Sequence, residues 1–222
     1  HIFELVVVEA ENQELETSQN SPELEIDGLE ALLNDGVAFN NAQIMPVDQY
    51  KHTKIALIKD MFTSNDLKLL AEAYDKCKII DMPAQKELGR KQITDFSPVL
   101  KFTQFNNALL NKINELMGSE FSIISPVLWE DAEGYELGIH KDTFDFTDYG
   151  GAMQVYLPSS CQQSAGTRFY RDANNGFRDY VINVPFIPNS GYICTDCTNI
   201  SHSSGLPVEA GLFRRSIYFI LS

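Results

Sequence analysis

Residues 134–142 read GYELGIHKD and close on the triplet His140-Lys141-Asp142. On a β-strand, residues i and i+2 point to the same side, so His140 and Asp142 can bind one ion from one short strand. A third ligand must then come from a distant segment, and His202 is the only later histidine in the chain. The triplet therefore predicts a strand with two metal ligands, in a fold that returns His202 to it.

Two imidazoles and one carboxylate are a ligand set with a known preference. They hold non-haem Fe(II) and leave coordination positions open for a substrate and O2. An H-x-D triplet alone also fits a surface strand with unrelated polar residues. His202, the pair Arg214-Arg215 and the β-rich sequence around them favour the metal site.

The chain is β-rich from residue 121 onward, with short apolar runs separated by turn residues. We expect strands over residues 121–129, 135–142, 152–157, 167–170, 180–184, 191–195 and 214–221. Strands of this number and length are typical of an antiparallel sandwich or barrel. A further strand is expected at residues 55–58.

Two helices are predicted upstream of these strands, packed on their outside. Residues 63–66 read TSND, a helix N-cap sequence, and an apolar stripe follows. The stripe consists of Leu67, Leu70, Ala71, Tyr74 and Cys77. The second helix is expected to open at Ser97-Pro98 and to end at Gly118.

The negative charge of the chain is concentrated in residues 1–50, which contain eleven Asp/Glu and no Lys/Arg. The whole chain has 31 acids and 17 bases, so residues 51–222 carry 20 acids against 17 bases. We interpret residues 1–50 as an acidic, partly ordered arm. The sequence has no basic stripe, so a nucleic-acid partner is not expected. No apolar run is long enough to span a bilayer, so a membrane is not expected either. Four cysteines do not form a disulfide framework, so a cytoplasmic protein is expected.

The order of motifs around the triplet extends over most of the second half of the chain. GYELGIHKD is followed by a strand ending at Tyr156-Leu157-Pro158, by GTRFY at 166–170, by VPFIPNS at 184–190, by His202 and by RRSIYF at 214–219. This order resembles the Fe(II)/2-oxoglutarate-dependent oxygenases, and among them the prolyl-4-hydroxylase-like branch. The resemblance implies a mainly β fold with flanking helices (α+β) and a double-stranded β-helix core, the jelly-roll or cupin-like architecture. The oxygenase domain would span residues 51–222, with helical support over 51–120 and the β-helix over 121–222.

The resemblance also implies a site and a reaction. His140, Asp142 and His202 would bind Fe(II), and a basic residue about a dozen positions after His202 would bind the far carboxylate of 2-oxoglutarate. Arg214 and Arg215 both fit that spacing. Strand alternation places Arg214 with Ser216 on the more polar face, so Arg214 is preferred, with Ser216 as a second contact and Arg215 as the alternative. The implied enzyme uses O2, with ascorbate as an accessory reductant, and couples decarboxylation of 2-oxoglutarate to succinate with C–H oxidation, typically hydroxylation of a protein side chain or a small molecule.

Other residues and other functions stay open at this point. Trp129, Tyr135, Asp145 and Tyr156 are candidates for a substrate pocket, although most aromatic residues of a β-rich domain form its core. Cys194-x-x-Cys197 fits a pair of buried thiols better than a zinc site, because no second Cys pair is present. The rival functions are a non-catalytic β-sandwich binding module and a cupin-like metalloenzyme that uses no 2-oxoglutarate. The substrate and the oligomeric state cannot be predicted from these residues.

Overall fold

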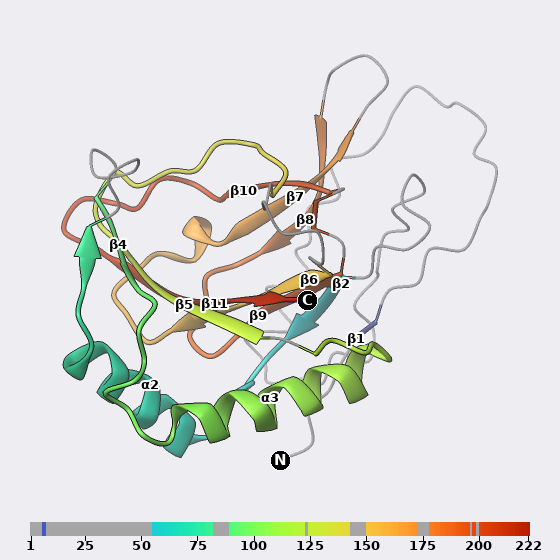
Figure 1. Cartoon of the computed structure of the whole chain (residues 1–222). Coiled ribbons are helices and arrows are strands. Elements are labelled where there is room, and N and C mark those ends of the chain that lie inside the picture. Colours follow the sequence, from blue (N-terminus) through green and yellow to red (C-terminus); the bar gives the residue numbers. More distant parts are fainter. Residues whose placement is uncertain are drawn as a thin grey trace.

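A computed structural model of the chain describes residues 6–7, 55–81, 89–122, 124–142, 150–172, 178–195, 197–198 and 200–222, with the side chains of 6–7 and 171–181 excepted. Two α-helices, one short 3-10 helix (Gln163–Ala165) and two antiparallel sheets are the regular elements of this part of the chain (Figure 1). Most of the acidic arm, the loop with Asp145 and parts of four other connections lie outside the described residues.

The larger sheet has eight strands in the order β1-β2-β9-β6-β11-β5-β4-β3, and every pairing in it is antiparallel. The strands are β1 (Val6–Val7), β2 (Ile55–Ile58), β3 (Ile80–Asp81), β4 (Arg90–Ile93), β5 (Ile124–Asp131), β6 (Gly151–Leu157), β9 (Gly191–Thr195) and β11 (Arg214–Leu221). The strands expected at 55–58, 191–195 and 214–221 are confirmed with the same bounds. β3 and β4 were missed, because their sequences alternate weakly.

The smaller sheet has three antiparallel strands in the order β10-β7-β8. They are β7 (Thr167–Asp172), β8 (Arg178–Val184) and β10 (Ser201–Ser204). Residues 167–170 and 180–184 were expected as strands. β10, which carries His202, was not expected, because SHSS has no apolar residue to mark a strand.

The two sheets enclose one core between them. Tyr156 and Tyr192 of the larger sheet share a hydrophobic cluster with Phe169 and Ile182 of the smaller sheet. The ring of Phe169 meets the ring of Tyr192 edge-on, with centroids 4.9 Å apart. Two antiparallel sheets packed face to face in this way form a jelly roll, so the predicted fold class is confirmed.

The opposite face of the larger sheet is covered by the two helices (Figure 1). Helix α2 (Ser64–Lys76) begins after a capping box, in which Thr63 accepts from the amide of Asp66 and the carboxylate of Asp66 accepts from the amide of Thr63. Its buried residues are Leu70 and Ala73, with Cys77 next to its end. Ala71, which was expected on the apolar stripe, is exposed. The spacing 70, 73, 77 follows one helix face, whereas residue 71 lies about 100° away from residue 70.

Helix α3 (Phe102–Met117) ends as expected at Gly118, whose left-handed φ of 60° suits glycine. It begins later than expected, because residues 97–101 form turns in which the amide of Val99 donates to Phe96 and the amide of Phe102 donates to Val99. No helix in the described part of the chain is both long and apolar enough to cross a membrane.

Candidate metal centre

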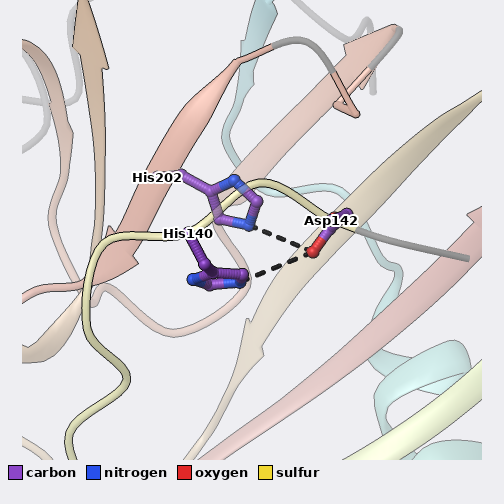
Figure 2. A group of neighbouring side chains, drawn as sticks. All are labelled: His140, Asp142 and His202. Carbon is purple, nitrogen blue, oxygen red and sulfur yellow. Dashed lines mark ion pairs between the residues drawn. The ribbon is translucent and has the colours of Figure 1, made fainter. Parts of the chain in front are cut away.

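The structure brings His140, Asp142 and His202 together, and one ligand atom of each lies within 4.8 Å of the others. The Nε2 atoms of His140 and His202 are 3.5 and 3.4 Å from Oδ1 of Asp142. Figure 2 shows both imidazole rings turned toward the same carboxylate oxygen. Residues separated by 60 positions therefore meet at one point, as the triplet predicted.

The backbone achieves this convergence without the strand expected at 135–142. His140 and His202 form an isolated β-bridge, in which each amide donates to the other residue's carbonyl at 2.9 and 2.8 Å. Upstream of it, the amide of Ser204 donates to Leu137, and the amide of Gly134 donates to Val208. Leu137 lies three positions before His140, whereas its partner Ser204 lies two positions after His202. Because the two spacings differ, the two segments cannot pair residue by residue as neighbouring strands do. The segment has no regular secondary structure apart from the bridge at His140, and the prediction of a strand there is wrong.

Both histidines are held in the tautomer that a metal ligand needs. Nδ1 of His140 lies 2.8 Å from the carbonyl of Gly138, and Nδ1 of His202 lies 3.3 Å from the carbonyl of Ile200. A carbonyl only accepts hydrogen bonds, so each Nδ1 carries a proton and each Nε2 is left to face Asp142. A metal ion that replaced the Nε2 protons would lie between two imidazole nitrogens and a carboxylate, a donor set that fits it.

Tyr218 supports the carboxylate from β11, because its hydroxyl donates to Oδ2 of Asp142 at 2.7 Å. Burial acts to raise the pKa of Asp142, but the hydrogen bonds from His140, His202 and Tyr218 outweigh it and hold this pKa well below its usual range. The hydrogen bond to Asp142 raises the pKa of His140, against the effect of burial. Asp142 is therefore ionised at neutral pH and ready to bind a cation.

The two arginines at the start of β11 point in opposite directions. Arg215 lies on the helix side, donates to Glu130 at 2.9 Å and stacks over the ring of Tyr74. Arg214 lies on the inner face with Ser216 and Tyr218, the face that reaches Asp142. Its Nε and Nη2 donate to Asp131 at 2.9 and 2.7 Å, and its Nη1 donates to Ala165 at 2.5 Å.

Ser216 ends a buried chain of hydrogen bonds on the same inner face. Tyr156 donates to Thr167 at 2.8 Å, Thr167 donates to Gln154 at 3.1 Å, and Gln154 donates to Ser216 at 3.0 Å. Ser216 accepts in this chain, and no acceptor in the described part of the structure takes its hydroxyl hydrogen, so that hydrogen can be donated to a ligand. The roles of Arg214 and Ser216 in binding a co-substrate stay predictions.

The candidate pocket residues are placed in different surroundings. Tyr156 is fully buried beside Phe186, with ring centroids 5.0 Å apart. Tyr135 is fully buried, and Trp129 packs against Arg90. Asp145 lies outside the described residues. Their role in a substrate pocket stays a prediction. Cys194 and Cys197 are buried free thiols.

Three supporting residues of the site were not identified from the sequence: Tyr218, Gln154 and Asp131. Strand alternation already placed Tyr218 on the face of Arg214, and that pattern could have indicated it. Gln154 and Asp131 gave no such signal, because their partners come from other strands.

No protein-family model matches the chain, and no curated protein matches it in sequence. Solved structures do match. A prolyl-4-hydroxylase from Pseudomonas putida superposes with a TM-score of 0.54 at 16% identity, over 79% of this chain and 95% of the other. HygX from Streptomyces hygroscopicus, solved with nickel, 2-oxoglutarate and hygromycin B, gives a TM-score of 0.55 at 13% identity, over 76% and 82%. The chain has the fold of the 2-oxoglutarate- and Fe(II)-dependent oxygenases.

A third structure of this oxygenase fold covers more of the chain. An oxidoreductase of the 2OG-Fe(II) oxygenase family from Burkholderia pseudomallei matches 92% of this chain and 93% of its own, with a TM-score of 0.54 at 12% identity. The resemblance expected from the motifs is thus confirmed for the fold. One fold hosts different activities, so the function has to be argued from the site itself.

Proposed function

We propose that this protein is an Fe(II)- and 2-oxoglutarate-dependent oxygenase that hydroxylates a protein side chain or a small molecule. The observation that carries the proposal is the convergence of two Nε2 atoms on one ionised carboxylate, with Nε2–Oδ1 distances of 3.4 and 3.5 Å. The oxygenase fold supports the same conclusion, since HygX was solved with nickel and 2-oxoglutarate bound. Bound Fe(II) would supply the coupling of 2-oxoglutarate decarboxylation with oxidation of a substrate C–H bond by O2.

The residues of the chain would hold and orient the reactants. His140, Asp142 and His202 are the proposed ligands, and three protein ligands leave coordination positions open. Tyr218 and the carbonyls of Gly138 and Ile200 would fix the orientation of those ligands. Arg214, with Ser216 beside it, is the proposed partner of the far carboxylate of 2-oxoglutarate, because it lies on the inner face that leads to Asp142.

The proposed substrate is either a protein side chain or a small molecule, and the similar structures illustrate both options. One of them is a prolyl-4-hydroxylase, and another was solved with hygromycin B. We propose no nucleic acid and no membrane as partners, since the chain carries no basic stripe and residues 51–222 have nearly balanced charge.

The first experiment tests the metal centre and turnover together. Wild-type protein should bind Mn(II) or Fe(II), and should release succinate and CO2 from 2-oxoglutarate with Fe(II) and ascorbate. Asp142→Asn should lose metal binding and turnover, whereas Asp75→Asn, an exposed carboxylate on α2, should retain both. A wild type that binds neither metal would contradict the proposal and favour a non-catalytic binding module.

The second experiment tests the co-substrate anchor. Arg214→Met leaves Asp131 paired with Arg90, so the fold should persist while 2-oxoglutarate affinity falls at least about tenfold. Arg215→Met should leave the affinity near that of wild type, because Arg215 lies on the helix side. Calorimetric titration of the Mn(II)-loaded proteins measures both. If the protein binds the metal but neither Arg214→Met nor Arg215→Met changes its affinity for 2-oxoglutarate, a cupin-like metalloenzyme would be favoured.

A further inference from the structure

The inner face of the larger sheet carries a buried group of three charges at the ends of β4, β5 and β11. Asp131 is fully buried, Arg90 is 7% exposed and Arg214 is 3% exposed. Arg90 donates to Oδ1 of Asp131 through Nε at 2.5 Å and to Oδ2 through Nη2 at 3.0 Å. Arg214 donates to Oδ2 through Nε and Nη2. One carboxylate therefore serves two guanidinium groups.

The group carries a surplus of one positive charge. Two guanidinium groups contribute two positive charges, and Asp131 contributes one negative charge. Among the described residues, no second carboxylate lies within ion-pair distance of Arg90 or Arg214. A buried charge without a partner is costly, because the protein interior does not solvate it as water does. The surplus charge is thus a reason to expect an anion here.

The group also has hydrogen-bond donors left over. Arg90 uses Nε and Nη2 on Asp131, and no acceptor within the described part of the chain engages its Nη1. Among the residues that the structure describes, the hydroxyl of the fully buried Tyr135 has no hydrogen-bond partner. The ring of Tyr135 lies 4.2 Å from the guanidinium carbon of Arg90 and 5.4 Å from that of Arg214. Buried polar groups normally have partners, so an unpaired hydroxyl beside surplus positive charge indicates a missing acceptor.

We propose that Arg90 and Tyr135, together with Arg214, form a binding site for a ligand carboxylate, and that Asp131 is a positioning residue that holds both guanidinium groups. The inference rests on the proposed function, because the ligand with this chemistry is an oxo acid whose second carboxylate lies away from the metal. A free dicarboxylate offers the same chemistry without chelating a metal. Arg90 lies outside the motifs that the sequence resemblance covers, and Tyr135 lies in the first of them, GYELGIHKD, without a role in carboxylate binding there, so both assignments come from the geometry.

Tyr135→Phe is the sharpest test, since it removes only the unpaired hydroxyl. A purely structural role predicts unchanged or slightly higher stability and unchanged ligand affinity, because no existing hydrogen bond is lost. A ligand role predicts an unchanged thermal midpoint together with a dissociation constant for 2-oxoglutarate raised about tenfold in the Mn(II)-loaded protein. The affinity for 2-oxobutyrate, which keeps the chelating end but lacks the second carboxylate, should not change.

Arg90→Met tests the surplus charge with a matched control. It leaves Arg214 and Asp131 as a balanced pair, and the methionine stem can fill the space between Trp129 and Tyr135. The preference of the Mn(II)-loaded protein for 2-oxoglutarate over 2-oxobutyrate should fall at least about tenfold. Lys91→Met, the neighbouring cation on the opposite face of β4, should keep the wild-type preference.

The outcomes separate this inference from the proposed function. A wild type that binds Mn(II) but neither oxo acid would overturn the proposed function. Succinate binding to metal-free wild type that Tyr135→Phe weakens would still support the carboxylate site, with a free dicarboxylate as its ligand. The proposed site would be overturned if Tyr135→Phe and Arg90→Met both bound 2-oxoglutarate as tightly as wild type and Tyr135→Phe did not weaken succinate binding.

Discussion

Tyr218 shows how one hydroxyl can set the quality of the metal centre. Its donation to Oδ2 of Asp142 at 2.7 Å leaves Oδ1 facing the two imidazoles. Without this hydrogen bond the carboxylate of Asp142 can rotate, so metal binding itself has to fix its orientation. Groups that orient metal ligands typically change metal affinity about 10- to 100-fold when removed.

Tyr218→Phe should therefore weaken Mn(II) binding about tenfold or more while leaving the thermal midpoint of the metal-free protein nearly unchanged. Titration followed by electron paramagnetic resonance of free Mn(II) measures the affinity. Tyr170→Phe is a suitable control, because Tyr170 bonds to Ser203 on the face of the smaller sheet that points away from His202. Equal Mn(II) affinity in Tyr218→Phe and wild type would remove Tyr218 from the site.

At the scale of elements, the sequence predicted what local patterns determine. The capping box at Thr63, the stop at Gly118 and the bounds of β9 and β11 all follow from neighbouring residues. Residues 135–142 were predicted to be a strand, as one of the short β-rich runs that turn residues separate. The irregular spacing of their bonds to 202–208 depends on the distant segment, so no local pattern contains it.

The same distinction between local patterns and distant contacts applies to the residues of the site. The three proposed metal ligands, and the face that Arg214 shares with Ser216 and Tyr218, could be predicted from a motif and strand alternation. The pairing of Arg214 with Asp131 could not, because residues 83 positions apart meet only through the register of β5 with β11.

The turn before β7 depends on Gly166, where the backbone passes close to other backbone. A Cβ at this position would lie 1.8 Å from the carbonyl oxygen of Val184. Gly166→Ala must therefore separate β7 from β8, and should lower the free energy of unfolding by about 2 kcal/mol or more. Gly138→Ala should change it by less than about 0.5 kcal/mol, because a Cβ there meets nothing within 4 Å. Urea denaturation measures both variants, and equal stability would contradict the close approach.

For the whole molecule, the charge group around Asp131 connects elements that are far apart in the sequence. Asp131 joins Arg90 of β4 to Arg214 of β11, and Arg214 also donates to the carbonyl of Ala165, just before β7 of the smaller sheet. Burial acts to raise the pKa of Asp131, but Arg214 and Arg90 outweigh it and lower this pKa below its usual range. The charged form of Asp131 is therefore favoured by folding.

This shift gives the stability of the whole domain a definite pH dependence. A carboxyl whose pKa is lower in the folded state adds stability above its unfolded pKa of about 3.9, and that stability is lost as pH falls toward the folded value. Wild-type protein should therefore keep this contribution at pH 5–8 and lose it progressively below about pH 4. Asp131→Asn leaves two buried guanidinium groups without a carboxylate, and should cost about 3–5 kcal/mol at pH 7. Because the group that titrates is gone, its stability should fall less steeply with acid than that of wild type or of Asp75→Asn, as measured by urea denaturation at each pH. Parallel acid profiles for all three proteins would mean that the charge of Asp131 does not stabilise the folded domain.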